Sequence, residues 1–152
     1  MSSTVSVVLD GEVCTAKNTR VVSGPNVRID PSTGDIIPDS NLEMSITGNY
    51  HVFYRRKQMF GKKGIDWLDG KNCKDTIKKL VSCSVYLLML PDGPYINKAK
   101  KKHDELGKKG YNHSPFKIDY WTPIPSNAKK AIDDLVYLAN EAPKTATWSV
   151  SG

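Results

Sequence analysis

Apolar and polar residues alternate at the start of the chain, in the pattern of a strand that buries one face. Within residues 4–13 the apolar side chains of Val5, Val7 and Leu9 are two positions apart. The dipeptide Asp10-Gly11 that follows is typical of tight hairpin turns. The pattern therefore predicts a β-hairpin.

The next segments predict more extended structure, interrupted by turns. Residues 20–29 predict a second extended pair, and residues 30–40 predict a loop whose Ile36-Ile37 contacts the core, because turn-forming residues dominate this stretch. Alternation returns over residues 42–60 and predicts another hairpin, with its turn at Gly48-Asn49. Together these segments predict an antiparallel sheet built mainly from the N-terminal half.

Helical spacing begins after Asn72, where this side chain and Asp75 are placed to cap a helix start. Beyond Leu80 the sequence becomes continuously apolar and rich in strand-forming residues. Residues 81–90 therefore fit either a buried strand or the rest of a long helix, because periodicity alone does not separate the two. The turn-forming residues 91–94 end either element.

The C-terminal half predicts two helices and two strands. Residues 95–106 predict a short basic helix, and residues 127–141 predict a helix capped by Ser126 with a continuous apolar stripe. The aromatic stretch 116–121 and the alternating stretch 145–150 each predict a strand, the second at a sheet edge.

This order of elements favours an α+β fold, in which an antiparallel sheet packs with two or three helices. A length of 152 residues fits a single domain spanning residues 1–152. The composition, 39% hydrophobic and 25% charged, is that of a soluble globular protein rather than a disordered one.

Membrane insertion and secretion are not expected from the sequence. The longest apolar run, residues 85–90, is far shorter than the roughly 20 residues that a membrane-spanning helix needs. The N-terminus has no basic segment followed by an apolar core, so no signal peptide is predicted. We therefore expect a cytoplasmic protein, although export by a machine that reads no such signal stays compatible with the sequence.

The three cysteines, Cys14, Cys73 and Cys83, do not follow the spacing of metal ligands. An odd number leaves at least one thiol free, and reduced, mostly buried thiols are the ordinary interpretation. The sequence therefore predicts no metal site and no cofactor.

The charge is distributed unevenly along the chain. Residues 1–50 carry a net charge of −3, whereas residues 51–117 carry sixteen Lys or Arg and six Asp or Glu, a net charge of +10. Such a density of cations attracts polyanions, because phosphates or carboxylates then replace the counterions. The alternative is a solvated basic face that keeps the protein soluble.

Aromatic residues are interleaved with these cations, and this combination is typical of nucleic-acid binding. We therefore predict a nucleic acid as the partner, with RNA favoured over DNA, and another acidic polymer or an acidic protein as alternatives. The candidate binding residues are Arg55, Arg56, Lys57, Lys62, Lys63, Lys100, Lys101, Lys102, Lys108 and Lys109.

The bound RNA could also be cleaved without a metal, as in a ribonuclease or a toxin-type effector. Its 2′-hydroxyl is an internal nucleophile, so that the protein needs to supply a general base, a general acid and a cation at the phosphate. Histidine suits both proton transfers near neutral pH. His51, beside Arg55, is one candidate, with His113 and Tyr111 as partners from elsewhere in the fold.

A second interpretation starts from Cys73, which lies at the predicted start of a helix between Lys71 and Lys74. The helix dipole and these lysines would lower its thiol pKa. With His113 and Asp119 downstream, the order Cys, His, Asp is similar to that of papain-like amidases of the NlpC/P60 kind. The resemblance implies a cysteine hydrolase that acts on amide bonds. The structural alternative is a cysteine packed under the sheet.

A third interpretation is a non-catalytic interaction or structural protein, such as a viral or phage component, whose basic face meets an acidic partner. The three interpretations differ in whether His113 comes close to Cys73 or to His51, and in whether RNA binding depends on salt.

Overall fold

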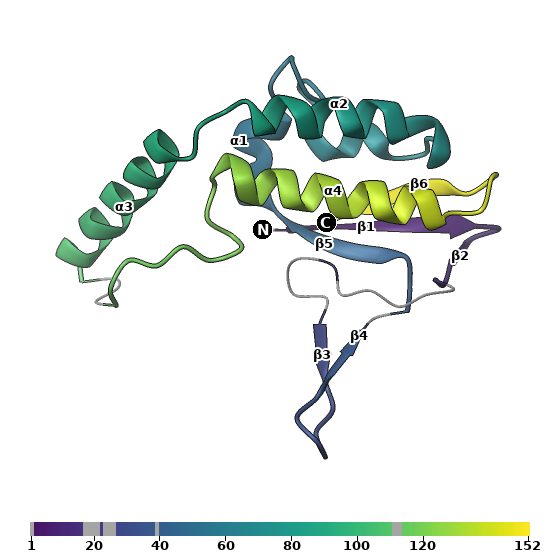
Figure 1. Ribbon diagram of the computed structural model, residues 1–152, viewed down its shortest axis with the longest axis horizontal. Coiled ribbons are helices and arrows are strands. Elements are labelled where there is room, and N and C mark those ends of the chain that lie inside the picture. Colours follow the sequence, from purple (N-terminus) through teal and green to yellow (C-terminus); the bar gives the residue numbers. More distant parts are fainter. Residues whose placement is uncertain (1, 17–21, 23–26, 39, 111–113) are drawn as a thin grey trace.

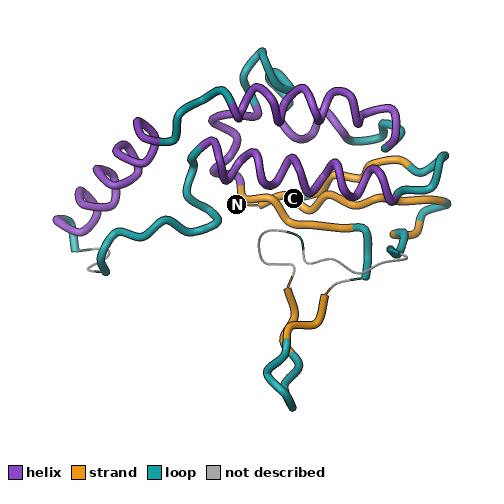
Figure 2. Tube along the Cα trace, in the orientation of Figure 1, coloured by secondary structure: helices purple, strands orange, loops and turns teal. Residues whose placement is uncertain are grey.

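The computed structural model describes residues 2–16, 22, 27–38, 40–110 and 114–152. It confirms the α+β class. An antiparallel sheet of mostly N-terminal strands, completed by a C-terminal strand, packs with helices on one side (Figures 1 and 2). The described residues contain four α-helices, where the sequence predicted two or three.

Strand β1 (Ser2–Leu9) is the centre of the sheet. It pairs antiparallel with β2 (Glu12–Val13), β5 (Glu43–Thr47) and β6 (Thr147–Ser151). The turn between β1 and β2 has positive φ at both central residues, 54° at Asp10 and 81° at Gly11. These angles are those of the two-residue turn that Asp-Gly favours, so the predicted hairpin is confirmed.

Strand β6 confirms the strand predicted near the C-terminus, and a connecting segment covers its outer edge. The Trp148 amide donates to the Lys71 carbonyl at 2.8 Å, and the Gly70 amide donates to the Trp148 carbonyl at 2.8 Å. The Cys73 amide donates to the Ala146 carbonyl at 3.0 Å. Backbone groups that an edge strand would leave unpaired are thereby satisfied.

A small second hairpin projects from the body of the molecule in Figure 1. It consists of β3 (Val27–Ile29) and β4 (Ile36–Pro38), which pair antiparallel. The prediction of a loop over residues 30–40 was therefore wrong at residues 36–38, which form β4, whereas residues 30–35 connect the two strands without regular structure. Most of the extended pair predicted over residues 20–29 lies outside the described residues.

The hairpin predicted for residues 42–60 was also wrong, because β5 is followed by helical turns. These are the 3₁₀ turn η1 (Gly48–Tyr50) and the short helix α1 (His51–Tyr54). The Thr47 hydroxyl accepts a hydrogen bond from the Asn49 amide at 3.3 Å and caps the first turn. Phe53 and Tyr54 are both buried, although neighbouring residues of a strand point to opposite faces.

Three longer helices follow: α2 (Ile77–Leu88), α3 (Gly93–Lys108) and α4 (Pro125–Glu141). The ambiguous stretch 81–90 is thus helical for most of its length, and both helices predicted in the C-terminal half are confirmed. The strand predicted over residues 116–121 was wrong, because the segment between α3 and α4 has no regular structure where it is described.

Helices α2 and α4 run side by side above the sheet in Figure 1, and α3 leaves the body at the end of α2. The core contains apolar residues of the sheet and of both helices, among them Val5, Leu87 and Leu135. Among the described residues, no helix is both long and apolar enough to cross a membrane.

Two buried hydrogen bonds join distant parts of the chain in this core. The Trp148 indole donates to the Thr76 hydroxyl at 2.8 Å, and the Tyr54 hydroxyl donates to the Ala128 carbonyl at 2.8 Å. Both donors are therefore satisfied although their rings are almost fully buried.

Candidate functional site

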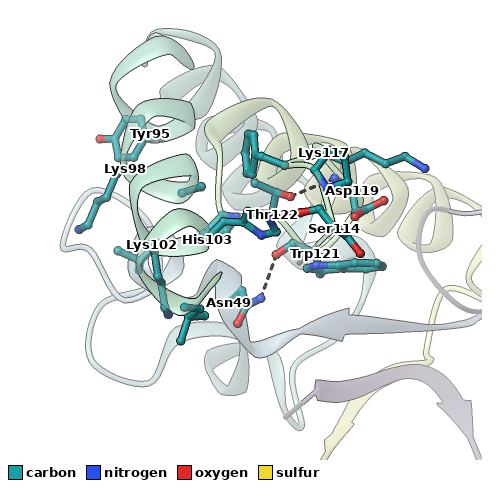
Figure 3. Close-up of a pocket in the computed structure, with 16 residues that line it drawn as sticks. Asn49, Tyr95, Lys98, Lys102, His103, Ser114, Lys117, Asp119, Trp121 and Thr122 are labelled. Carbon is teal, nitrogen blue, oxygen red and sulfur yellow. Dashed lines mark hydrogen bonds between the residues drawn. The ribbon is translucent and has the colours of Figure 1, made fainter. Parts of the chain in front are cut away.

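A groove of about 680 Å³ lies between helix α3 and the segment 114–123 that returns to the body (Figure 3). We call it the α3 groove. Helix α3 contributes one wall, the returning segment the other, and Asn49 and Val52 lie at the body end. Its residues are Asn49, Val52, Tyr95, Lys98, Ala99, Lys102, His103, Leu106, Ser114, Pro115, Phe116, Lys117, Asp119, Trp121, Thr122 and Pro123.

Helical spacing determines which side chains of α3 face the groove. Lys98 and Lys102 are four residues apart and therefore lie on the same side of the helix. Ala99, His103 and Leu106 continue this face along the wall. None of the residues of α3 is fully buried, so this helix offers most of its surface to solvent.

The opposite wall is attached to α3 and to the body by specific contacts. His103 Nε2 lies 2.6 Å from the Ser114 carbonyl oxygen, and the His103 ring meets Phe116 edge to face with 5.7 Å between centroids. At the other end, the Asn49 side-chain amide donates to the Trp121 carbonyl at 2.9 Å. These contacts attach the returning segment to α3 at one end and to Asn49 at the other.

The groove combines positive charge with exposed aromatic surface. Lys98 and Lys102 on α3 and Lys117 on the returning segment are the lysines that line it. Tyr95 and Trp121 lie in the same groove, and the Trp121 side chain is 48% exposed. Because an exposed indole and lysines line one groove, a planar anionic ligand can both stack and pair its charge there.

Of the ten cations predicted from the sequence, only Lys102 lines this groove. The exposed Lys100, Lys101, Lys108 and Lys109 lie on α3 or directly after it but are absent from the lining. Arg55, Lys57, Lys62 and Lys63 are exposed around α1 and the turn that follows it, also away from the lining.

The Arg56 guanidinium is used in contacts within the protein. It donates to the hydroxyls of Tyr86 and Tyr95, each at 3.1 Å, and lies over the Phe53 ring at 5.1 Å from its centroid. The hydrogen bond to Tyr86 is the largest cause that raises the pKa of Arg56. This arginine therefore joins α1 to the end of α2 and the start of α3.

His51 lies in α1 against Gly64 and is not part of the groove lining. Its Nδ1 atom is buried and has no hydrogen-bond partner among the described residues. Burial lowers the pKa of His51, and the nearby Arg55 charge lowers it further. The other two residues of the predicted ribonuclease site, His113 and Tyr111, lie outside the described residues.

Cys73 is fully buried, and its environment opposes thiolate formation. Burial is the largest effect and raises the pKa of this thiol to about 12, although Lys74 acts in the lowering direction. The expectation of a lowered pKa was therefore wrong, because loss of hydration outweighs the nearby lysine. Asp119, the third residue of the amidase interpretation, lines the α3 groove, and Cys73 does not.

Sequence reasoning missed Lys98, Lys117 and Tyr95 as site residues. The spacing of Lys98 and Lys102 was visible in the sequence, but only the direction of α3 shows which lysines face the groove.

Among the described residues, no group of three or more His, Cys, Asp or Glu side chains could hold a metal ion.

Comparison with known proteins finds no matching protein-family model, no matching curated protein and no matching solved structure. The α3 groove must therefore be interpreted from its own chemistry.

Proposed function

We propose that the α3 groove binds a short stretch of single-stranded nucleic acid, with RNA as the favoured ligand. One observation carries the proposal: the cationic side chains of Lys98, Lys102 and Lys117 belong to the same groove as the exposed Trp121. Cations that follow the phosphates and an aromatic face that stacks a base are the two features that single-strand binding requires.

The aromatic residue favours a single strand over a duplex. In a duplex the base faces are covered by neighbouring base pairs, so Trp121 could reach a base only after it is unstacked. Single-stranded RNA presents these faces freely, and sequence-specific RNA recognition is usually directed at such unpaired bases. The net charge of +6 supports the proposal, because it raises the local concentration of any polyanion.

The proposal is tested by fluorescence anisotropy with a labelled single-stranded RNA of mixed sequence and about 10 nucleotides, within the size that single-strand sites cover. We expect the double substitution Lys98→Glu/Lys102→Glu to weaken binding about tenfold or more, since two groove cations become anions. The matched control is Lys100→Glu/Lys101→Glu, on the same helix. It changes the net charge equally but alters no groove residue.

The salt dependence separates a defined site from diffuse attraction. Each phosphate neutralised on a single strand contributes about −0.7 to the slope of log affinity against log salt. The groove variant should reduce the magnitude of this slope by about 1.4, whereas the control variant should leave most of it intact. Equal losses in the two variants would show that binding is unspecific and would contradict the proposed site.

Metal-independent cleavage stays a prediction beside this binding function. It is measured by incubating the same RNA with the protein and a chelator, followed by denaturing gel electrophoresis. His51→Ala and His113→Ala are the variants that would identify the proton-transferring groups. An intact RNA after long incubation would leave a binding protein, and absence of binding as well would favour the interaction protein of the third interpretation.

A further inference from the structure

The α3 groove contains one feature that phosphate binding alone does not explain. Asp119 lies on the returning wall of the groove near Lys117, across from the α3 wall that carries Lys98 and Lys102 (Figure 3). A carboxylate in the groove repels phosphate and opposes the attraction that the groove's lysines exert on it. Its presence is therefore explained best by a ligand group that donates hydrogen bonds.

The backbone around Asp119 is held in place from several directions. Its amide donates to the Thr122 hydroxyl at 3.0 Å. Its carbonyl accepts from the Asn127 side-chain amide at 2.8 Å and from the Thr122 amide at 3.1 Å. A polar group on such a fixed backbone can impose orientation on a ligand, because little conformational freedom is lost on binding.

Trp121 stands two residues further along the same wall and is also positioned by its neighbours. Its carbonyl is bound by Asn49, and Tyr120 contacts its ring edge to face, with 5.0 Å between centroids and 83° between planes. Trp121 stays 48% exposed, so Tyr120 contacts one part of the indole and another part is accessible to a ligand. A base stacked there would present its edge to residues of the same wall.

We propose that Asp119, together with Trp121, makes this groove selective for guanine in single-stranded RNA; this inference rests on the proposed function. The Watson–Crick edge of guanine carries two adjacent donors, N1–H and the N2 amino group, which match the two oxygens of a carboxylate. Adenine and cytosine place an acceptor beside their single amino group, and uracil places its one donor between two carbonyls. A bidentate contact therefore distinguishes guanine from the other three bases.

The test uses oligouridylates of about 10 nucleotides that carry one central guanosine, adenosine or cytidine, with plain oligouridylate as reference. A single substitution avoids the self-association of guanine-rich strands. We expect the guanosine oligonucleotide to bind about tenfold more tightly than the others, within the range of a good bidentate base contact. Trp121→Ala should weaken binding of all four oligonucleotides.

The decisive variant is Asp119→Asn, which keeps the shape but replaces one acceptor with a donor. It should abolish the preference for guanosine and leave or improve the affinity for the other three oligonucleotides, because a repulsive charge is removed. Asp104→Asn is the matched control: it removes the same charge from an exposed residue of α3 outside the groove, and it should retain the preference.

Other outcomes separate this inference from the function on which it rests. If all four oligonucleotides bind equally and the Lys98→Glu/Lys102→Glu variant still weakens them, guanine selectivity is wrong and the proposed function stands. If Asp119→Asn strengthens every complex equally and the preference persists, another group reads the base. Failure of the wild-type protein to bind any of the four contradicts both proposals.

Discussion

His51 and Gly64 pack directly against each other, and this contact determines which residue can occupy position 64. Gly64 has a φ angle of 57°, in the left-handed region that glycine adopts readily. A Cβ atom at this position would lie 3.0 Å from His51 Nδ1 and 3.2 Å from Arg55 Cγ. Both the backbone angle and the space therefore favour glycine.

We predict that Gly64→Ala lowers the free energy of unfolding by about 1–3 kcal/mol, because a left-handed alanine is strained and its methyl group meets the imidazole ring. The measurement is urea denaturation followed by circular dichroism. The control is Gly61→Ala, where φ is 77° but nothing lies within 4 Å of the added Cβ. The difference between the two variants isolates the contacts of the added methyl group with His51 and Arg55, and equal losses would contradict them.

Helix α3 is held to the rest of the molecule by a small number of polar and aromatic contacts. Arg56 binds Tyr86 and Tyr95, and the Phe53 ring lies 5.0 Å from that of Tyr95. At the same junction the Asp92 carboxylate accepts from the Ser126 amide at 2.9 Å and thereby caps the start of α4. The predicted cap, the Ser126 side chain, is not used in this way.

Arg56→Ala should therefore loosen α3 more than it destabilises the whole fold. We expect lower hydrogen-exchange protection over residues 93–108, because two hydrogen bonds and the stacking on Phe53 are lost, with little change in α4. Arg55→Ala is the control, since Arg55 is exposed and one position away. Unchanged protection of α3 in Arg56→Ala would show that other contacts hold this helix.

Elements with a strong local signal could be predicted from the sequence. The apolar stripe of residues 127–141 predicted α4, and Asp10-Gly11 predicted the turn between β1 and β2, because both signals depend on neighbouring residues. Residues 116–121 have the composition of a strand, but they form a wall of the α3 groove instead of pairing in the sheet. Where this segment docks depends on residues far apart in the chain and leaves no local pattern.

In the candidate site too, features with a local sequence signal were predicted, and features that depend on distant residues were not. Lysines on α3 and aromatic residues after it were evident from the sequence, and Lys102 was among the predicted residues. Lys98 and Lys117 were not, because their position depends on how α3 is oriented and on where the returning segment docks. The direction of the Cys73 pKa shift was predicted wrongly. Its position near a helix start can be read from neighbouring residues, whereas its complete burial depends on the packing of the whole core.

Over the whole molecule, the cations of residues 51–117 have different environments. Lys98, Lys102 and Lys117 line the α3 groove, whereas Lys71 and Lys79 lie over the Trp67 ring, at 4.4 and 5.6 Å from its centroid. The block therefore includes cations in structural contacts as well as cations available to a ligand, so net charge alone overstates the binding surface.

The core also gives the molecule a specific response to alkaline pH. Burial raises the pKa of the Cys73 thiol from its ordinary value of 9.0 to about 12 and that of the Cys83 thiol to about 11. The Tyr50 hydroxyl is raised from 10.0 to about 12, again chiefly by burial. In each case the folded state favours the protonated, neutral form.

The sign of the effect follows from proton binding. Below about pH 9 both states keep these protons, so the stabilising contribution is complete. Above about pH 9 the unfolded chain releases protons that the folded chain retains, and the free energy of unfolding falls until the pH reaches the raised values. We therefore predict that the urea midpoint decreases steadily between about pH 9 and pH 11, under reducing conditions and at constant ionic strength.

The variant Cys73→Ala/Cys83→Ala tests the cause of this decrease. Without the two thiols, most of the fall near the ordinary cysteine pKa should disappear, leaving the share of Cys14, whose pKa burial also raises. The part due to Tyr50 and the buried Tyr54 remains at higher pH. Comparing each protein with its own midpoint at neutral pH removes the stability lost through the substitutions themselves. If the variant and the wild type show the same relative decrease near pH 9, the thiols ionise equally in both states, and their burial does not set the alkaline limit of the fold.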